Sequence, residues 1–200
     1  SGALEDMPDD QEKIMSGNAD EHAADPVEPE EQPAYPKLNT FSATDLQKTN
    51  DTPIHFIIEN LLTPGLSILA SPPKYGKSWM VLALCIAVAS GEKFLGHPTN
   101  RCGCLYLALE DSRTRLKSRL EKLLAGKPAP RDIYFSTESN CVDHGLLDEL
   151  ASFLSEHPNV GLIVIDTLQR VRGGTHLKES AYAADYREMT QLKVFADRHN

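Results

Sequence analysis

Residues 66–91 read LSILASPPKYGKSWMVLALCIAVASG, and this stretch decides the fold. The apolar run at 66–70 predicts a short strand. The longer apolar run at 77–90 has helical length, and Gly91 is placed to end it. Because that run is apolar on nearly every face, we expect the helix to lie buried against a sheet. Between the two elements lies the loop SPPKYGKS, residues 71–78.

Strand-like and helix-like patterns alternate along the rest of the chain. Strands are expected at 104–110, 133–137 and 160–166, and helices at 111–126, 146–157 and 182–199. Strands that alternate with helices are typical of a parallel sheet covered on both faces. The sequence therefore predicts an α/β fold, a mainly parallel sheet with helices on both faces. Because the chain ends after a helix, we expect the C-terminal strands of that sheet to be missing.

The charge of the chain is concentrated at one end. Residues 1–36 hold 11 acidic side chains and one lysine, a net charge of −10. Because the whole chain has a net charge of −9, residues 37–200 are close to neutral. This segment has no apolar periodicity, which predicts a disordered linker or tail at 1–37 followed by one domain at 38–200. It is either a solvated spacer or an acidic interaction segment.

Two absences limit the classes of protein to consider. The sequence has no apolar run of 18 residues and no basic leader, so we expect no membrane association and a cytoplasmic location. Its four cysteines, Cys85, Cys102, Cys104 and Cys141, lack paired CxxC spacing. We expect them to be reduced, mostly buried thiols and not zinc ligands.

The loop at 71–78 has the features of a phosphate-binding loop. It joins a predicted strand to a helix, where backbone N–H groups and the helix dipole favour an anion. Gly76 allows close backbone approach, Lys77 reaches the β- and γ-phosphates, and the Ser78 hydroxyl binds Mg²⁺. The usual first glycine is replaced by Ser71, which we expect the turn to tolerate. The predicted nucleotide-contacting set is Ser71, Pro72, Pro73, Lys74, Tyr75, Gly76, Lys77, Ser78 and Trp79.

Two carboxylates follow the strongest predicted strands. Asp166 ends the strand LIVID, at the edge of the sheet where ligands of doubly wound folds bind, and it is predicted to hold Mg²⁺ with Ser78. Glu110 ends the strand at 104–110 and is predicted to orient and deprotonate the attacking water. Alternatively, Glu110 and Asp111 only cap the next helix. We expect Asp111 or Ser112 to form the cap.

Three stretches of the sequence together resemble a known family: SPPKYGKSWMVLALCIAVASGEKFLGHP, CLYLALEDSRTRLKSRL and LIVIDTLQRVRGG. Their order resembles that in the RecA-like AAA ATPases related to the plasmid replicative helicase RepA, and more distantly that in the DnaB and KaiC group. The resemblance covers about residues 41–200. It implies a P-loop NTPase fold, ATP and Mg²⁺ as cofactors, Glu110 and Lys77 as catalytic residues, and Arg119 near the adenine. It also implies a homo-oligomeric ring such as a hexamer.

In such rings, single-stranded DNA is gripped by loops that follow the Asp-bearing strand. The corresponding segment is QRVRGGTHLKES, with Arg170, Arg172 and Lys178 as predicted phosphate contacts. An ordinary solvated loop is an equally good interpretation. The leading functional hypothesis is an ATP-driven helicase or DNA-dependent ATPase that replicates a mobile element. The alternative is a regulatory or scaffold protein that binds ATP and partners without translocation.

Overall fold

The computed structural model describes residues 38–50, 55–173 and 180–199. The chain divides into two compact units, Ser1–Asn50 and Asp51–Asn200. Residues 1–37, which were predicted to be disordered, lie outside the described residues. Lys178, a predicted DNA contact, also lies outside them. None of the described helices is both long enough and apolar enough to cross a membrane.

The described part of the first unit, residues 38–50, contains one short helix, α1 (Ala43–Lys48). It begins with a capping box, in which the Ser42 side chain accepts a hydrogen bond from the Asp45 N–H and the Asp45 carboxylate accepts one from the Ser42 N–H. The hydrogen bond from the Ser42 hydroxyl, followed by the one from its backbone, lowers the pKa of Asp45.

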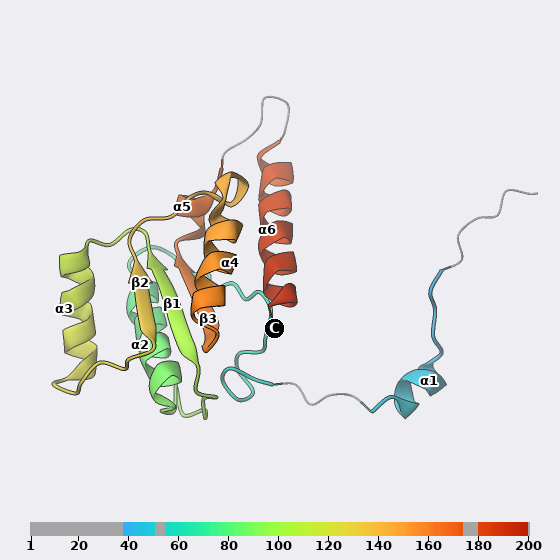
Figure 1. The fold of residues 1–200 in the computed structure, drawn as a ribbon, viewed down its shortest axis with the longest axis horizontal. Helices are drawn as coiled ribbons and strands as arrows, with labels where there is room; N and C mark the ends of the chain where they lie inside the picture. Colours follow the sequence, from blue (N-terminus) through green and yellow to red (C-terminus); the bar gives the residue numbers. More distant parts are fainter. Residues whose placement is uncertain (1–37, 51–54, 174–179, 200) are drawn as a thin grey trace, which may run out of the picture. The chain divides into compact units, whose positions relative to one another are not determined.

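The second unit is built on a parallel sheet in the order β2–β1–β3 (Figure 1). The central strand β1 (Gly103–Ala108) pairs with β2 (Ile133–Ser136) on one side and β3 (Val160–Asp166) on the other. Every residue of β1 is buried, because it has a strand on each side and helices above and below. The three strands confirm the predictions at 104–110, 133–137 and 160–166 within two residues.

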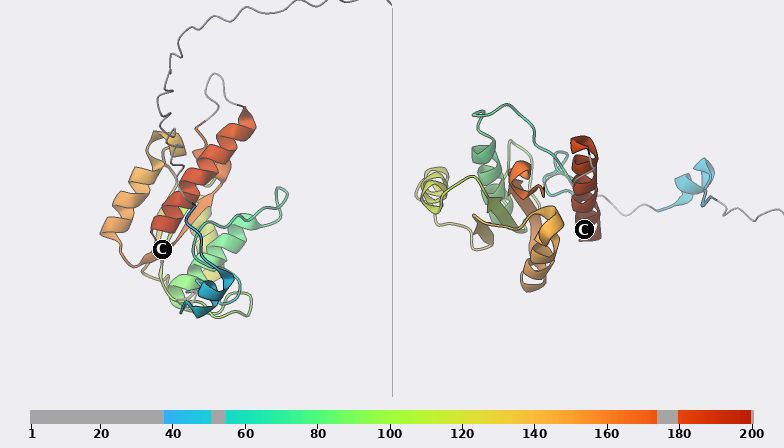
Figure 2. Two further views of the ribbon diagram at one scale, coloured as in Figure 1. Left: turned by 90° about the vertical axis from the view of Figure 1, so that its right-hand side faces the viewer. Right: turned by 90° about the horizontal axis from the view of Figure 1, so that it is seen from above.

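Helices cover both faces of this sheet, as the views in Figures 1 and 2 show. On one face lie α2 (Lys77–Ser90) and α3 (Arg113–Leu124). On the other lie the 3₁₀ turn η1 (Val142–His144) and the helices α4 (Leu146–Glu156), α5 (Leu168–Val171) and α6 (Ala181–Arg198). The predicted α/β class, with a parallel sheet and helices on both faces, is therefore confirmed.

The strand period of two divides β1 between two cores. Cys104, Tyr106 and Ala108 pack with α2 and α3, whereas Leu105 and Leu107 pack with α4, α5 and α6. All four cysteines are free thiols, as expected, with Cys85 and Cys104 fully buried. Burial raises the pKa of the half-buried Cys102 to about 11.

One predicted strand is absent. Residues 66–70 pair with no strand and lie exposed, with Ile68 at 70% and Leu69 at 47% of their full accessible area. A helix makes its hydrogen bonds within itself, but a strand exists only where a neighbour supplies the other half of the ladder. Among the described residues β3 pairs only with β1. The prediction of a strand at 66–70 is wrong for this structure, although the helix after the loop forms as expected.

Candidate active site

The loop before α2 makes its final turn at Gly76. Gly76 is the residue before the first helical position, and its φ of 86° and ψ of 15° are left-handed. A Cβ added there would meet nothing within 4 Å. The space beside Gly76 is therefore open, and glycine is required by the backbone conformation and not by crowding.

The N-termini of the long helices are of two kinds: α2 and α4 begin after the left-handed glycines Gly76 and Gly145, whereas α3 and α6 begin after a serine. Ser112 caps α3 and Ser180 caps α6, each by accepting a hydrogen bond from a backbone N–H of the first turn. No described side chain caps α2 in this way, because Gly76 has none to offer. Its first-turn N–H groups and the positive end of its dipole remain available to an anion.

Lys77 supplies the positive charge at this helix start. Its Nζ donates to the carbonyl oxygens of Ser71 at 2.7 Å and Pro72 at 3.0 Å, and lies 3.3 Å from the Ser71 hydroxyl. The serine that replaces the usual glycine therefore points toward the lysine and adds an acceptor to its surroundings. The ammonium group stays within the loop, where a phosphate approaching the N–H groups of α2 would meet it.

The other predicted loop residues differ in exposure. Ser78 and Gly76 are half-buried, whereas Pro72, Pro73, Lys74 and Tyr75 are exposed, Tyr75 at 77%. Lys74 adopts a positive φ of 68° at the tip of the turn. The structure thus presents Ser78 at the helix start and leaves the Tyr75 ring in solvent.

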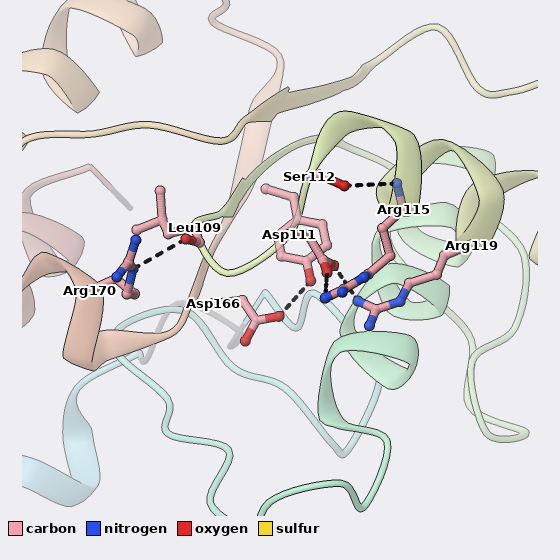
Figure 3. Close-up of polar contacts among 8 residues, drawn as sticks. Leu109, Asp111, Ser112, Arg115, Arg119, Asp166 and Arg170 are labelled. Atoms are coloured by element: carbon pink, nitrogen blue, oxygen red, sulfur yellow. Dashed lines mark hydrogen bonds and ion pairs between the residues drawn. The ribbon is translucent and has the colours of Figure 1, made fainter.

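The β1–β3 ladder brings the two predicted carboxylates to one edge of the sheet. Ala108 is in register with Asp166, and the Leu109 N–H donates to the Asp166 carbonyl at 2.9 Å, so Glu110 follows directly. Arg170 Nε donates to the Leu109 carbonyl at 3.2 Å and closes the same corner (Figure 3). The hydroxyl of Thr167 donates to Glu110 Oε1 at 3.0 Å.

Asp166 has a buried partner that the sequence analysis did not identify. The Tyr106 hydroxyl donates to Asp166 Oδ2 at 2.7 Å. Burial first, and then this hydrogen bond, raises the pKa of the Tyr106 phenol well above its ordinary value. The only signal in the sequence was one hydroxyl-bearing residue inside the apolar run CLYLAL.

Asp111 holds two arginines of α3. Arg119 forms a short ion pair with Asp111, and Arg115 lies 3.4 Å from its other oxygen. The Asp111 side chain is only 6% exposed. The cap of α3 is Ser112, one of the two residues we expected. Asp111 is therefore free of the capping role and pairs with the two arginines instead (Figure 3).

Arg119 connects α3 to the start of α2. Its guanidinium carbon lies 5.6 Å from the centre of the Trp79 ring, in cation–π geometry. Trp79 is two residues after Lys77, and the Arg119 partner Asp111 is the residue after Glu110. Through these contacts the first turn of α2 is connected to the end of β1. The position of Arg119 near the adenine stays a prediction.

The two described arginines predicted to bind DNA both have partners within the chain. Arg170 contacts the Leu109 carbonyl, and Arg172 forms ion pairs with Asp185 and Glu188 of α6. Glu188 is 2% exposed and also accepts a hydrogen bond from the Gly173 N–H at 3.0 Å. The DNA contact of Arg170 and Arg172 stays a prediction.

A shallow groove of about 250 Å³ lies away from these residues, between α3 and β2. Its lining is largely apolar and includes none of the predicted site residues: Arg113, Leu116, Lys117, Leu120, Phe135 and Thr137.

The donor set at the loop and the sheet edge suits a magnesium–nucleotide complex. No cluster of three or more His, Cys, Asp or Glu side chains among the described residues is arranged to hold a metal by itself. Mg²⁺ in nucleotide sites usually takes one or two protein oxygens and completes its shell with phosphates and water. The hydroxyl of Ser78 and the carboxylate of Asp166 are ligands of that type, and the uncapped start of α2 suits the phosphates.

Comparison with known proteins gives a family. The sequence matches the AAA domain family over residues 30–200, which suggests ATP binding and hydrolysis. No curated protein matches the chain. The family match covers most of the sequence and agrees with the parallel sheet, the loop before α2 and the two carboxylates at the sheet edge, and the chain belongs to the AAA domain family.

Proposed function

We propose that this chain is the ATP-binding and ATP-hydrolysing domain of a RepA-like helicase or DNA-dependent ATPase, acting in the replication of a mobile element. The observation that carries the ATPase part is the combination of an uncapped helix start at Gly76 with Glu110 and Asp166 on adjacent strand ends. One element is suited to bind phosphates, and the other supplies a general base and a metal ligand.

In the proposed mechanism, the backbone N–H groups at the start of α2 bind phosphate oxygens. Lys77 exchanges its loop carbonyls for the β- and γ-phosphates and offsets the negative charge that develops on them. Ser78 and Asp166 would hold Mg²⁺, which when bound would draw charge from the phosphate oxygens. Glu110 orients a water for in-line attack and accepts its proton on a carboxylate oxygen.

Thr167 has a defined part in this arrangement. Its hydroxyl donates to Oε1 of Glu110 and so restricts the orientation of the carboxylate, which keeps further acceptor positions for the water. Base-to-water geometry is a precondition for general-base catalysis. The hydrogen bond across the β1–β3 ladder therefore supports Glu110 as the base.

The helicase part rests on the resemblance of the three motifs and on the segment that follows β3. We propose a homo-oligomeric ring that grips single-stranded DNA near Arg170 and Arg172. A second function is favoured by one observation. Arg172 is paired with Asp185 and Glu188, which suits a nucleotide-dependent switch or scaffold in which Arg172 contacts α6 and does not grip DNA.

The experiment is ATP turnover by the purified chain with Mg²⁺, with and without single-stranded DNA, for the wild type and Glu110→Gln. We expect Glu110→Gln to lower turnover by about 10²- to 10⁴-fold, because general-base catalysis contributes about that much. The matched control is Glu156→Gln, which changes an exposed carboxylate at the end of α4 and should leave turnover unchanged. Equal turnover in wild type and Glu110→Gln would exclude Glu110 as the base.

DNA stimulation separates the two candidate functions. A motor that grips Z phosphates of a single strand should lose DNA affinity with salt at a log–log slope of about −0.7Z. If single-stranded DNA does not change the rate of ATP turnover at any salt concentration, the result would favour the switch or scaffold.

A further inference from the structure

Tyr106 is an unusual residue at the centre of the sheet. It lies in the middle of β1, has no exposed area, and its ring packs 6.0 Å from the Phe135 ring in a tilted arrangement. A phenylalanine would fill this position equally well as an apolar side chain. A buried hydroxyl costs free energy unless it finds a partner, and Tyr106 finds Asp166.

The register of the sheet explains how the two side chains meet. Tyr106 is opposite Val164 in the β1–β3 ladder, and Asp166 is two residues further along β3. Residues two apart on a strand face the same side. Val164 packs in the core formed with α2, so Tyr106, Val164 and Asp166 all belong to the face that α2 covers.

The hydrogen bond constrains the carboxylate in a specific way. It occupies Oδ2 of Asp166 at 2.7 Å and leaves Oδ1 for another ligand. A lysine or arginine at this place would also fix the carboxylate, but its positive charge would compete with a cation. A neutral phenol restricts the orientation of Asp166 and leaves its negative charge available.

We propose that Tyr106 is a positioning residue that holds the Asp166 carboxylate in the orientation that binds Mg²⁺ of the Mg–ATP complex. The proposal rests on the proposed function, in which Asp166 is a metal ligand. Partners that orient metal ligands through hydrogen bonds commonly affect metal affinity by about 10- to 100-fold. Tyr106 makes no contact with the nucleotide in this scheme and acts only through Asp166.

The test is Tyr106→Phe, which removes the hydroxyl and keeps the ring. Binding of a fluorescent ATP analogue is measured in EDTA and across a Mg²⁺ titration. We expect the half-saturating Mg²⁺ concentration to rise about tenfold, while the affinity in EDTA stays within twofold of wild type. A merely structural role would change both affinities together or neither.

The matched control is Tyr134→Phe on β2. Tyr134 is a half-buried sheet tyrosine whose ring packs with Phe153 at 5.3 Å on the opposite face. It should leave the Mg²⁺ dependence unchanged. In an Asp166→Asn background, Tyr106→Phe should add no further effect, because the hydroxyl acts through the carboxylate.

The outcomes are distinguishable. A wild-type chain that binds the ATP analogue no better with Mg²⁺ than in EDTA overturns the proposed function and this inference together. A wild type with Mg²⁺-dependent binding and an identical Tyr106→Phe variant overturns the inference alone. Should Tyr106→Phe fail to fold, 3-fluorotyrosine at position 106 is followed by ¹⁹F NMR. A signal that moves on adding Mg²⁺ to the ATP-bound chain supports the inference, and a signal that does not move overturns it.

Discussion

The starts of α2 and α3 meet the same physical requirement in opposite ways. Both helices follow a turn beside the sheet, and each has first-turn N–H groups without helical partners. Ser112 satisfies one of these in α3 by accepting from the Arg115 N–H at 3.3 Å. At α2 the preceding residue is Gly76, with no side chain and open space beside it. One helix start is therefore closed by a side chain of its own, whereas the other leaves its first-turn N–H groups without a side-chain cap, as the start of α4 after Gly145 also does. What distinguishes α2 is the Lys77 ammonium held beside its start.

The largest effect on ATP affinity is expected at the uncapped start of α2. Lys77→Ala removes the ammonium group that donates to the carbonyl oxygens of Ser71 and Pro72 within the loop, and we expect ATP affinity to fall by about 10- to 100-fold. Hydrogen bonds to charged groups contribute about 1.5–3 kcal/mol, and 1.4 kcal/mol is tenfold in affinity. Equilibrium titration with a fluorescent nucleotide measures it. The control is Lys122→Ala, an exposed lysine of α3, and equal weakening in both variants would contradict a specific role.

The next effect concerns the backbone of the same turn. Gly76→Ala should destabilise the chain by about 1–2 kcal/mol, because a Cβ disfavours left-handed backbone. Gly96→Ala is the matched control, since Gly96 also has a positive φ of 87° and open space around it. Urea unfolding should show similar losses for both, whereas only Gly76→Ala should weaken ATP binding. Unchanged ATP affinity in Gly76→Ala would show that this turn is not part of the phosphate site.

A change at the capped start of α3 should lower the free energy of unfolding without changing ATP affinity. Ser112→Ala removes the cap of α3 and should cost about 1 kcal/mol of unfolding free energy. ATP affinity should stay within about twofold, because the cap bonds only to its own helix. Thermal unfolding and nucleotide titration on the same samples check both. A large loss of ATP affinity would mean that α3 positions the site more directly, through Asp111 and Arg119.

The smallest effect is expected at Ser71, the residue that stands where the usual loop pattern has glycine. Ser71→Gly restores the usual loop pattern and removes the hydroxyl 3.3 Å from Lys77, while both carbonyl acceptors remain. We expect ATP affinity to change by less than about threefold, because this exposed contact is long and Lys77 keeps its two shorter bonds to carbonyl oxygens. Nucleotide titration decides it, and a change of tenfold or more would show that Ser71 is a functional departure from the pattern.

Much of the local structure was predictable. The helix at 77–90 and its end at Gly91, the cap at Ser112, and the strand at 160–166 all appear as expected. Each depends on residues close together in sequence, since helical hydrogen bonds and caps join positions three or four apart. The strand at 160–166 was identified because its continuous apolar run suits a strand with helices on both faces.

The sequence by itself determined the α/β alternation, the phosphate-loop pattern at 71–78 and the two carboxylates at strand ends. Only the tertiary structure decided that residues 66–70 stay outside the sheet, that Tyr106 bonds to Asp166, and that Asp111 joins Arg119 while Arg172 joins α6. The reason is the range of the interactions. The strand ladders and the Tyr106–Asp166 bond join residues far apart in the chain, and even the Asp111–Arg119 pair, whose members are eight positions apart, depends on how the turn before α3 packs.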